Sequence, residues 1–234
     1  MTIDEGNTSM QDDSFAGRYV LVFGGTGALG AGVAAALSAA AATVTVVDRA
    51  EPGDERRLAG VEYLTADVGD ENTVREVLGT APAPWAVLNT IGGFAPERPL
   101  AELDLMELTG QIELNLVTAA VITKHALRVM QPAGAGRIVH TASRAGVVTK
   151  GSGFAYSVSK AGVLRLVSMA ADEVRGTGIT VNCVVPSIID TPANRAAIPG
   201  ADYDAWPKIP DIARTYVFLA APSSGLVNGA AIPV

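Results

Sequence analysis

Short apolar runs alternate along the chain with longer stretches in which apolar and polar residues follow helical spacing. Runs rich in β-branched residues predict buried strands, and the Ala-rich or amphipathic stretches between them predict helices. The predicted strands cover residues 19–23, 43–48, 61–65, 85–88, 137–141, 179–185 and 230–234. The predicted helices cover residues 28–40, 70–78, 103–130 with a break near Thr109 and Gly110, 156–175 and 211–220.

This alternation predicts a parallel sheet, because two consecutive parallel strands need a crossover that the intervening helix supplies. We therefore expect an α/β fold with a doubly wound parallel sheet of about seven strands, flanked by helices on both faces. Residues 1–16 are polar and lack periodicity, so we expect a mobile N-terminal tail. Residues 17–234 are expected to form a single domain.

Composition and charge narrow the choice of partners. Of the 234 residues, 49% are hydrophobic and 5% aromatic, which predicts a core made mainly of Ala, Val, Leu and Ile. The 17 basic and 24 acidic side chains give a net charge of −7, and Lys and Arg form no stripe. This pattern argues against a nucleic acid or an anionic membrane as the partner.

Metal-binding residue types are scarce. Cys183 is the one cysteine and lies in an apolar run, so an internal disulfide is excluded and a buried, inert thiol is expected. The two histidines are expected at the surface (His125) and in the core or near a site (His140), and we expect no metal site. We expect no membrane-spanning segment and find no signal-peptide pattern, which favours a cytoplasmic protein.

A glycine-rich run follows the first predicted strand and opens the first predicted helix. It reads Gly24, Gly25, Thr26, Gly27, Ala28, Leu29 and Gly30. Glycines allow a tight turn and leave no Cβ between the backbone and a pyrophosphate, while the helix N-terminus offers N–H donors. The run therefore predicts a dinucleotide-binding site, with a plain glycine-rich turn as the alternative.

The end of the second predicted strand bears on which dinucleotide binds. Asp48 lies 18 residues after Gly30, where a carboxylate accepts hydrogen bonds from a ribose diol and repels a 2′-phosphate. Arg49 follows and would instead contact a phosphate. The pair predicts NAD(H) as the preferred cofactor, with NADP(H) as the alternative. A glycine loop with an acidic strand end also suits S-adenosylmethionine, which leaves a methyltransferase open.

Four polar residues downstream have the types that proton transfer needs. Tyr156 and Lys160 lie four residues apart in a predicted helix and so project from one face. A phenol serves as a base near neutral pH only if its pKa falls by about 3 units, and a neighbouring ammonium lowers it. Ser143 follows a predicted strand and can donate to a substrate oxygen. Asn115 stands in a helix interior, where asparagine is unfavourable unless its side chain is used.

Each of these residues alone has an ordinary structural explanation. Such explanations do not account for their order and spacing after a glycine loop. Together they resemble the short-chain dehydrogenase/reductase family, from about Arg18 to the C-terminus. The resemblance implies a Rossmann fold and an NAD(P)-dependent oxidoreductase that interconverts an alcohol and a carbonyl. It assigns Tyr156 as the acid/base, Lys160 as the group that tunes it and binds ribose, Ser143 as the substrate-oxygen donor, and Asn115 as support for a proton relay.

The resemblance also implies further cofactor contacts. Asp67 and Val68 would lie beside the adenine, Asn89 and Gly92 would end the fourth strand, and Pro186, Ile189 and Thr191 would meet the nicotinamide end. The chain departs from the family pattern at Phe23, Ala28, Thr90, Ile91 and Ser187. A short stretch at 193–210 stands where a substrate lid is usual, with Tyr203 and Trp206 as pocket walls or as packing.

Other functions share this scaffold. A catalytically silent dinucleotide-binding sensor and a dihydropteridine reductase-like or epimerase-like relative are the alternatives. The family commonly forms oligomers, and we expect a homodimer or homotetramer built on the two helices that hold Asn115 and Tyr156. The outer faces of these helices, with Val117, Val163 and Val167, are apolar enough for such a contact.

Overall fold

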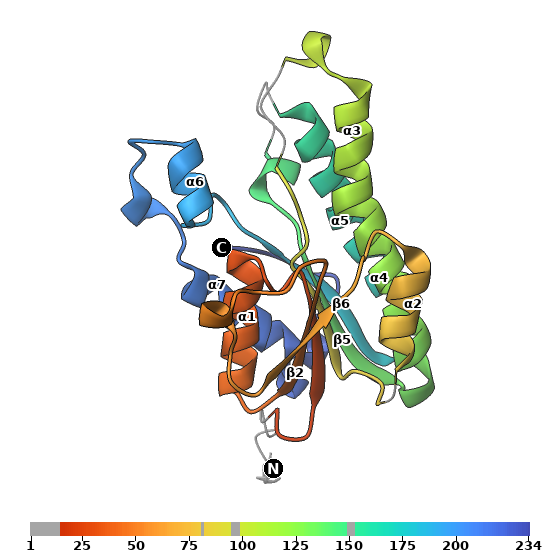
Figure 1. The fold of residues 1–234 in the computed structure, drawn as a ribbon. Coiled ribbons are helices and arrows are strands. Elements are labelled where there is room, and N and C mark those ends of the chain that lie inside the picture. The colour runs from red at the N-terminus through yellow and green to blue at the C-terminus, as the bar shows by residue number, and fades with distance from the viewer. Residues whose placement is uncertain (1–14, 81, 95–98, 149–152) are drawn as a thin grey trace, which may run out of the picture.

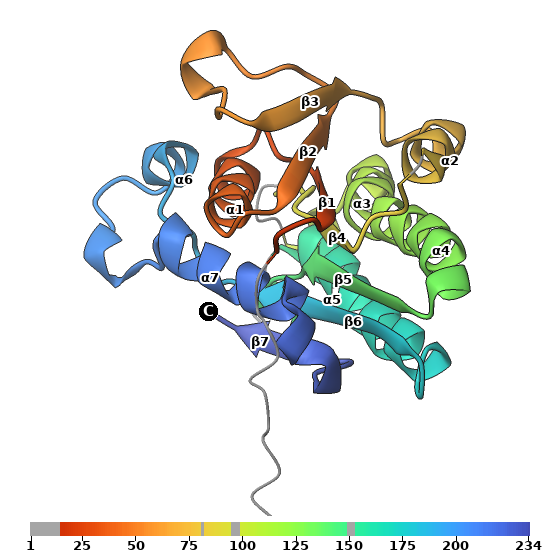
Figure 2. The ribbon, with the colours of Figure 1, turned by 90° about the horizontal axis from the view of Figure 1, so that it is seen from below.

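One sheet of seven parallel strands organises the molecule. The structure is a computed structural model, and it describes residues 15–80, 82–94, 99–148 and 153–234. The strands are β1 (Tyr19–Phe23), β2 (Thr43–Asp48), β3 (Val61–Thr65), β4 (Ala86–Asn89), β5 (Ala135–Thr141), β6 (Gly178–Val185) and β7 (Ala231–Pro233). They pair in the order β3-β2-β1-β4-β5-β6-β7. Figure 1 shows the sheet between its helices, and Figure 2 labels each strand. The doubly wound parallel sheet predicted from the sequence is confirmed.

Helices cover both faces of this sheet. The helices are α1 (Ala28–Ala39), α2 (Glu71–Gly79), α3 (Leu105–Gln111), α4 (Thr118–Met130), α5 (Phe154–Glu173), α6 (Pro192–Ala197) and α7 (Ile209–Ala220). Helices α1 and α7 pack on one face, and α2, α4 and α5 on the other (Figure 2). Each face has its own core, centred on Leu37, Val46 and Tyr216 on the first and on Ile122, Ile138 and Val167 on the second.

The order of the strands places a crevice at the carboxyl ends of β1 and β4. Strand β1 pairs with β2 on one side and with β4 on the other, so Phe23 is opposite both Val47 and Asn89. The crossover after β1 leads to β2 on one side of the crevice, and the crossover after β4 leads to β5 on the other side. In sheets of this kind, ligands bind at the carboxyl edge where the strand order reverses.

The long helical region differs from its prediction. The predicted break near Thr109 and Gly110 is wrong, because both residues lie inside α3. The irregularity comes later, as a π-helical turn at Ile112–Val117 that contains Asn115. The Thr118 N–H and hydroxyl both donate to the Glu113 carbonyl, the hydroxyl at 3.1 Å, and so close the wider turn. Turns of this kind occur frequently at functional sites.

Three further predictions need correction. Phe15 is only 1% exposed and packs in the core of the α1/α7 face, so the packed region starts before residue 17. Residues 1–14 of the expected tail lie outside the described residues. His125 is buried rather than at the surface, with Nε2 3.0 Å from the Glu71 carboxylate on α2. Val163 and Val167 point into the core rather than outward.

One helical run meets the length and composition of a membrane span, contrary to the sequence-based expectation. It covers Leu105–Ala133. Core helices of water-soluble proteins pass the same test, and here the inner side chains of α4 pack against α2 and β5. One helix of this kind is weak evidence for a membrane span, and part of this run packs in the core, including Ile122, Ala126 and Met130.

Candidate active site

The glycine run forms a tight turn between β1 and α1. Gly24 has φ +81°, a left-handed conformation that favours glycine, and its N–H donates to the Val47 carbonyl at 2.8 Å. A Cβ on Gly30 would lie 2.2 Å from the Gly24 carbonyl oxygen, so only glycine fits there. Gly27 caps α1 without a side-chain hydrogen bond. The turn thus brings bare backbone and a helix N-terminus to the carboxyl edge of the sheet, as an anion site requires.

A cleft of about 730 Å³ opens in front of this turn. Its walls come from the ends of β1, β2, β3 and β4 and from the helical region that contains the π turn. The lining residues predicted from the sequence are Gly24, Thr26, Gly27, Asp48, Arg49, Asp67, Val68 and Gly92. The wall from the helical region, which includes Glu113, Leu114, Val117, Thr118 and Val121, was not predicted from the sequence. This part of the chain carries no recognisable motif, because its position at the cleft depends only on the crossover that follows β4.

Asp48 is held toward the glycine turn. Its Oδ2 accepts from the Thr26 N–H at 3.0 Å and from the Thr26 hydroxyl at 2.6 Å. Its Oδ1 accepts from the Arg49 N–H at 2.8 Å. The carboxylate therefore lies at the cleft wall in a fixed orientation. A glycine cradle, a helix N-terminus and a fixed acceptor in one cleft fit a nicotinamide dinucleotide.

Not every predicted cofactor residue lines the cleft. Gly25 packs on the Val46 side chain, and Gly30 packs on the turn itself. Ala28 and Leu29 begin α1, and Asn89 is buried beneath the site. The predicted residues outside the cleft lining are Gly25, Ala28, Leu29, Gly30, Asn89, Tyr156, Lys160, Pro186, Ile189 and Thr191.

The four proton-transfer candidates come together beside the cleft. Ser143 follows β5, caps a short 3-10 turn and is hydrogen-bonded to the Tyr156 phenol. Lys160 lies one helical turn after Tyr156, with Nζ 6.0 Å from the centre of the phenol ring. Its ammonium is almost fully buried and donates to the Thr141 carbonyl at 2.9 Å. Phe94 meets the Tyr156 ring edge to face at 5.3 Å.

Burial sets the ionisation of this cluster. It lowers the pKa of Lys160 to about 8, since the charged ammonium has lost its water. It also raises the pKa of Tyr156, an effect that the hydrogen bond from Ser143 partly offsets. The lowering of the phenol pKa expected from the sequence is therefore not found in the protein alone. Both groups are shifted toward their neutral forms.

Asn115 ties the π turn to the cluster. Its Oδ1 accepts from the Gly93 N–H at 3.2 Å, and its Nδ2 contacts the Ser159 hydroxyl at 3.1 Å. The same Nδ2 is 3.0 Å from the Gln111 amide oxygen. Ser159 in turn donates to the Tyr156 carbonyl at 2.8 Å. Asn115 therefore fixes the loop after β4 against the first turn of α5.

Gly92 joins the cleft to this cluster. It lines the cleft, and a Cβ placed on it would lie 2.9 Å from Lys160 Nζ and 3.0 Å from Asn115 Oδ1. Any side chain at this position would occupy the space next to both polar groups. The absence of a side chain thus leaves the lysine and the asparagine adjacent to the space in which a dinucleotide would lie.

A chain of hydrogen bonds behind the site defines the state of His140. The Thr123 hydroxyl donates to the Ala119 carbonyl at 2.8 Å, so it must accept from His140 Nε2, also at 2.8 Å. His140 Nδ1 then accepts from Asn89 Nδ2 at 3.2 Å, and Asn89 Oδ1 accepts from the Ile91 N–H at 3.0 Å. His140 is therefore neutral with the proton on Nε2. Burial and the nearby Lys160 lower its pKa to about 4.

The segment after β6 is attached to the Ser143 loop. The Arg144 N–H donates to the Pro186 carbonyl at 3.0 Å. Thr191 caps α6 by accepting from the Asn194 N–H, and the Ile189 carbonyl accepts from the Asn194 side chain at 2.8 Å. Helix α6 is thus part of the expected lid stretch and was not predicted from the sequence, although the Thr191-Pro192 pair was its signal.

Comparisons with known proteins agree with this geometry. The family model for short chain dehydrogenase matches residues 18–201. The chain is 34% identical to cis-4-hydroxycyclohexanecarboxylate dehydrogenase of Sinomonas cyclohexanicum, over 95% of this chain and 96% of that protein. It is 32% identical to a mitochondrial borneol dehydrogenase of Lavandula x intermedia, over 91% and 87%. The crystal structure of levodione reductase superposes with a TM-score of 0.85 at 26% identity, over 94% of this chain and 96% of that one.

The fold and the cleft define a Rossmann-type α/β enzyme. The chain belongs to the short-chain dehydrogenase/reductase family, and it is a dehydrogenase/reductase. The resemblance noted in the sequence is confirmed.

Proposed function

We propose that this enzyme interconverts an alcohol and a carbonyl with a nicotinamide cofactor, using Ser143, Tyr156 and Lys160, and that it prefers NAD(H). The observation that carries the proposal is the position of Gly92. This residue lines the cleft, and a Cβ placed on it would lie 2.9 Å from Lys160 Nζ. The glycine-loop half and the acid/base half of the site are therefore adjacent.

The roles follow from the contacts. A bound nicotinamide supplies the hydride chemistry. During alcohol oxidation, the Tyr156 phenolate accepts the hydroxyl proton, and in carbonyl reduction the phenol returns it. Ser143, already hydrogen-bonded to the phenol, holds the substrate oxygen at that position. Lys160 provides a positive charge one turn away, and Asn115 keeps the loop at Gly92 and Gly93 in place.

Asp48 supports the preference for NAD(H). Two groups of Thr26 and the Arg49 N–H already direct its carboxylate to the cleft wall. A carboxylate in this place accepts from a ribose diol and repels a 2′-phosphate. Arg49 is exposed at the same wall, so the preference is one of degree rather than exclusion of NADP(H).

The relatives suggest the class of substrate to test. Three of them are named for hydroxycyclohexanecarboxylate, borneol and levodione. We therefore propose secondary alcohols or ketones on a saturated ring as the substrate class. A panel of such compounds, assayed with NAD(H) and with NADP(H), tests both the reaction and the cofactor preference.

The decisive variant is Tyr156→Phe. Turnover is expected to fall by about 10²–10⁴-fold, the usual contribution of a positioned acid/base group. NADH affinity, measured by fluorescence titration, should change little because the phenol is outside the cleft lining. Tyr19→Phe, at the far end of β1, is the matched control and should keep full activity. Full activity in Tyr156→Phe would remove this residue from the mechanism, and tight cofactor binding without turnover of any compound would favour a silent sensor.

We also propose that the chain forms a homodimer or homotetramer. Two of the three valines first assigned to the contact, Val163 and Val167, are buried in the core, but other apolar side chains remain exposed on α5 and on the helical region before it. They are Leu105, Met106, Val158 and Met169, whereas Val117 lines the cleft. Light scattering at micromolar concentration tests this, and a monomer would refute it.

A further inference from the structure

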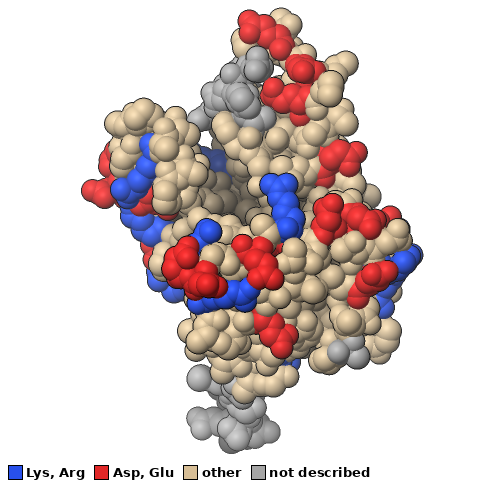
Figure 3. Space-filling model, in the orientation of Figure 1, with Lys and Arg blue, Asp and Glu red and all other residues tan. Residues whose placement is uncertain are grey.

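One wall of the cleft is the loop that follows β4. Thr90, Ile91, Gly92 and Gly93, called loop 90–93 below, all line the cleft. The molecule is hollowed between the α6 part and the region below α3, as Figure 3 shows. The loop also packs on the glycine turn, because a Cβ placed on Gly24 would lie 2.8 Å from the Ile91 nitrogen. The position of loop 90–93 therefore shapes the cleft and bears on the glycine turn.

Side-chain hydrogen bonds hold this loop at its two ends and in its middle. At the start, the Thr90 hydroxyl donates to the last carbonyl of β1 at 2.8 Å. At the end, the Gly93 N–H donates to Asn115 Oδ1 at 3.2 Å. In the middle, the Ile91 N–H donates to Asn89 Oδ1 at 3.0 Å. The middle contact exists only while the carboxamide of Asn89 turns its oxygen, rather than its nitrogen, toward the loop.

His140 decides the orientation of that carboxamide. Its Nδ1 lies 3.2 Å from Asn89 Nδ2, and its Nε2 lies 2.8 Å from the Thr123 hydroxyl. The hydroxyl gives its own proton to the Ala119 carbonyl, so Nε2 carries the ring proton and Nδ1 is an acceptor. An acceptor at Nδ1 requires the amide nitrogen of Asn89 on its side. The amide oxygen is then left for the Ile91 N–H.

The opposite tautomer would turn this arrangement round. With the proton on Nδ1, the ring of His140 would donate toward Asn89 and would require its amide oxygen. The amide nitrogen would then face the Ile91 N–H, and two donors would meet without an acceptor. The side chains of Asn89, Thr123 and His140 are at most 4% exposed. A partner lost here is not readily replaced by water, so the loss is costly.

We infer that His140, fixed by Thr123, is a positioning residue that holds loop 90–93 in its cofactor-binding position through Asn89. The inference rests on the proposed function, because that function assigns the cleft to the dinucleotide. His140, Thr123 and Asn89 do not themselves line the cleft. Cofactor affinity thus depends on a hydroxyl of α4 that acts through a histidine and an asparagine.

The first measurement is the exchange of the Ile91 amide hydrogen, followed by NMR in the enzyme without cofactor. Thr123→Val and His140→Leu should each speed this exchange at least about tenfold, because the acceptor of this N–H is no longer held in place. Thr123→Ser keeps the hydroxyl that fixes the tautomer and should keep the native rate. Exchange at the native rate in Thr123→Val and His140→Leu overturns the inference. Exchange in Thr123→Ser as fast as in Thr123→Val also overturns it.

The second measurement is the dissociation constant of NADH, obtained by fluorescence titration. Thr123→Val and His140→Leu should raise it about fivefold, the effect of one hydrogen bond, and Thr123→Ser should leave it unchanged. In steady-state assays the KM for NADH should rise by a similar factor. The value of kcat at saturating NADH should fall by less than about twofold, because Tyr156 and Ser143 keep their contacts. Equal NADH affinity in the native enzyme and in Thr123→Val overturns the inference.

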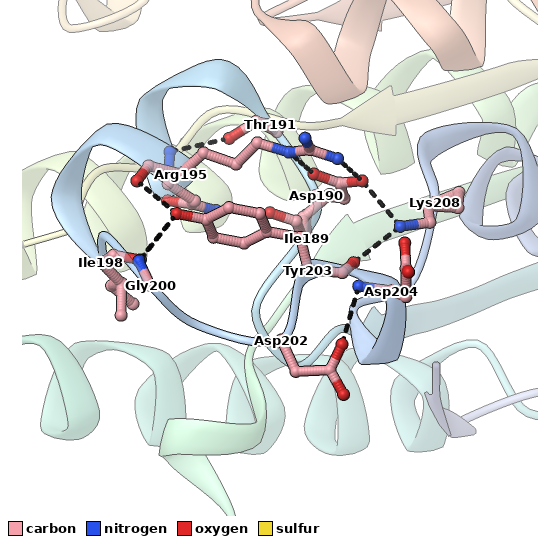
Figure 4. Close-up of polar contacts among 11 residues, drawn as sticks. Ile189, Asp190, Thr191, Arg195, Ile198, Gly200, Asp202, Tyr203, Asp204 and Lys208 are labelled. Atoms are coloured by element: carbon pink, nitrogen blue, oxygen red, sulfur yellow. Dashed lines mark hydrogen bonds and ion pairs between the residues drawn. The ribbon is translucent and has the colours of Figure 1, made fainter.

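Two control variants separate positioning from a general loss of stability. Arg137→Met removes a buried guanidinium that donates to backbone carbonyls elsewhere in the fold, and it should leave both measurements unchanged. Lys208 Nζ contacts the Asp190 carboxylate at 2.8 Å and the Tyr203 carbonyl at 2.7 Å (Figure 4). Lys208→Met breaks both contacts and should keep the native exchange rate of Ile91. If either control speeds this exchange as much as Thr123→Val does, the inference is overturned.

Failure of the proposed function gives a different result. Exchange of the Ile91 amide is measured without cofactor, and NADH affinity is measured without turnover. An enzyme that binds NADH and shows the expected exchange, but reduces no ketone, supports the inference and counts against the proposed reaction alone. An enzyme that reduces ketones while Thr123→Val leaves Ile91 exchange unchanged overturns the inference alone.

Discussion

His140 predicts a pH-dependent loss of stability that a single substitution should remove. Its side chain is fully buried, and both ring nitrogens are used, one accepting from Asn89 and one donating to Thr123. A protonated ring would carry hydrogens on both nitrogens and would lose the bond from Asn89. Burial and the nearby Lys160 accordingly lower the pKa of His140 from 6.5 to about 4.

The size and sign of this stability change follow from the difference in protonation of His140 between the folded and the unfolded chain. Between pH 6.5 and about 4 the unfolded chain binds a proton at this histidine and the folded protein does not. The free energy of unfolding therefore falls as the pH is lowered, by about 1.4 kcal/mol per pH unit. The loss begins near pH 6.5 and levels off near pH 4, for a total on the order of 3 kcal/mol. The Glu71 carboxyl, whose pKa is lowered to about 2 by Lys124 and His125, contributes only below about pH 4.5.

Urea unfolding at pH 7.5, 6.5, 5.5 and 4.7 measures this loss in the native chain and in His140→Gln. The variant is expected to be less stable at pH 7.5, because its amide cannot reproduce both ring contacts. Its stability should nevertheless fall much less between pH 6.5 and 4.7 than that of the native protein. The other histidine of the chain, His125, is present in both proteins and cancels in the comparison. An equal slope in the two proteins would refute the assignment of a neutral, buried His140.

Three further predictions concern stability and cofactor binding. Arg137→Met should lower the free energy of unfolding by about 3 kcal/mol in urea titrations, because the buried guanidinium donates to four backbone carbonyls. Gly30→Ala should raise the NADH dissociation constant at least about tenfold, since its Cβ would clash with the Gly24 carbonyl. Gly79→Ala, whose Cβ would meet nothing within 4 Å, is the control. Asp48→Ser should shift the kcat/KM ratio of NADPH to NADH by about tenfold or more toward NADPH, and an unchanged ratio would contradict the role of this carboxylate.

The strands were predictable because their signal is local and strong. Strands β1, β2 and β3 begin and end at the expected residues, and in β1 and β2 the signal is a buried, apolar, β-branched run. Buried parallel strands need apolar side chains on both faces, so the whole run is constrained at once. Helix ends were less well defined, since capping contributes only about 1 kcal/mol and tertiary contacts override it.

The π turn could not be predicted from the sequence. The contacts of Asn115 reach Gly93 and Ser159, which lie 22 and 44 residues away. Such partners are adjacent only after the sheet has formed, and no local pattern encodes them. The sequence did show an asparagine placed where a helix does not favour it. That signal marked the residue but not the wider turn around it.

The pKa values of Tyr156 and Lys160 depend on burial, which their spacing in the sequence does not reveal. The four-residue spacing from Tyr156 to Lys160 predicts one shared helix face, and the two side chains do lie together. Spacing alone suggested that the ammonium would lower the phenol pKa, but the fold buries both groups. Burial favours the neutral form of each, and for the phenol desolvation outweighs the hydrogen bond from Ser143. A phenolate at this site therefore needs positive charge from the cleft next to Gly92, which is where the oxidised cofactor is proposed to bind.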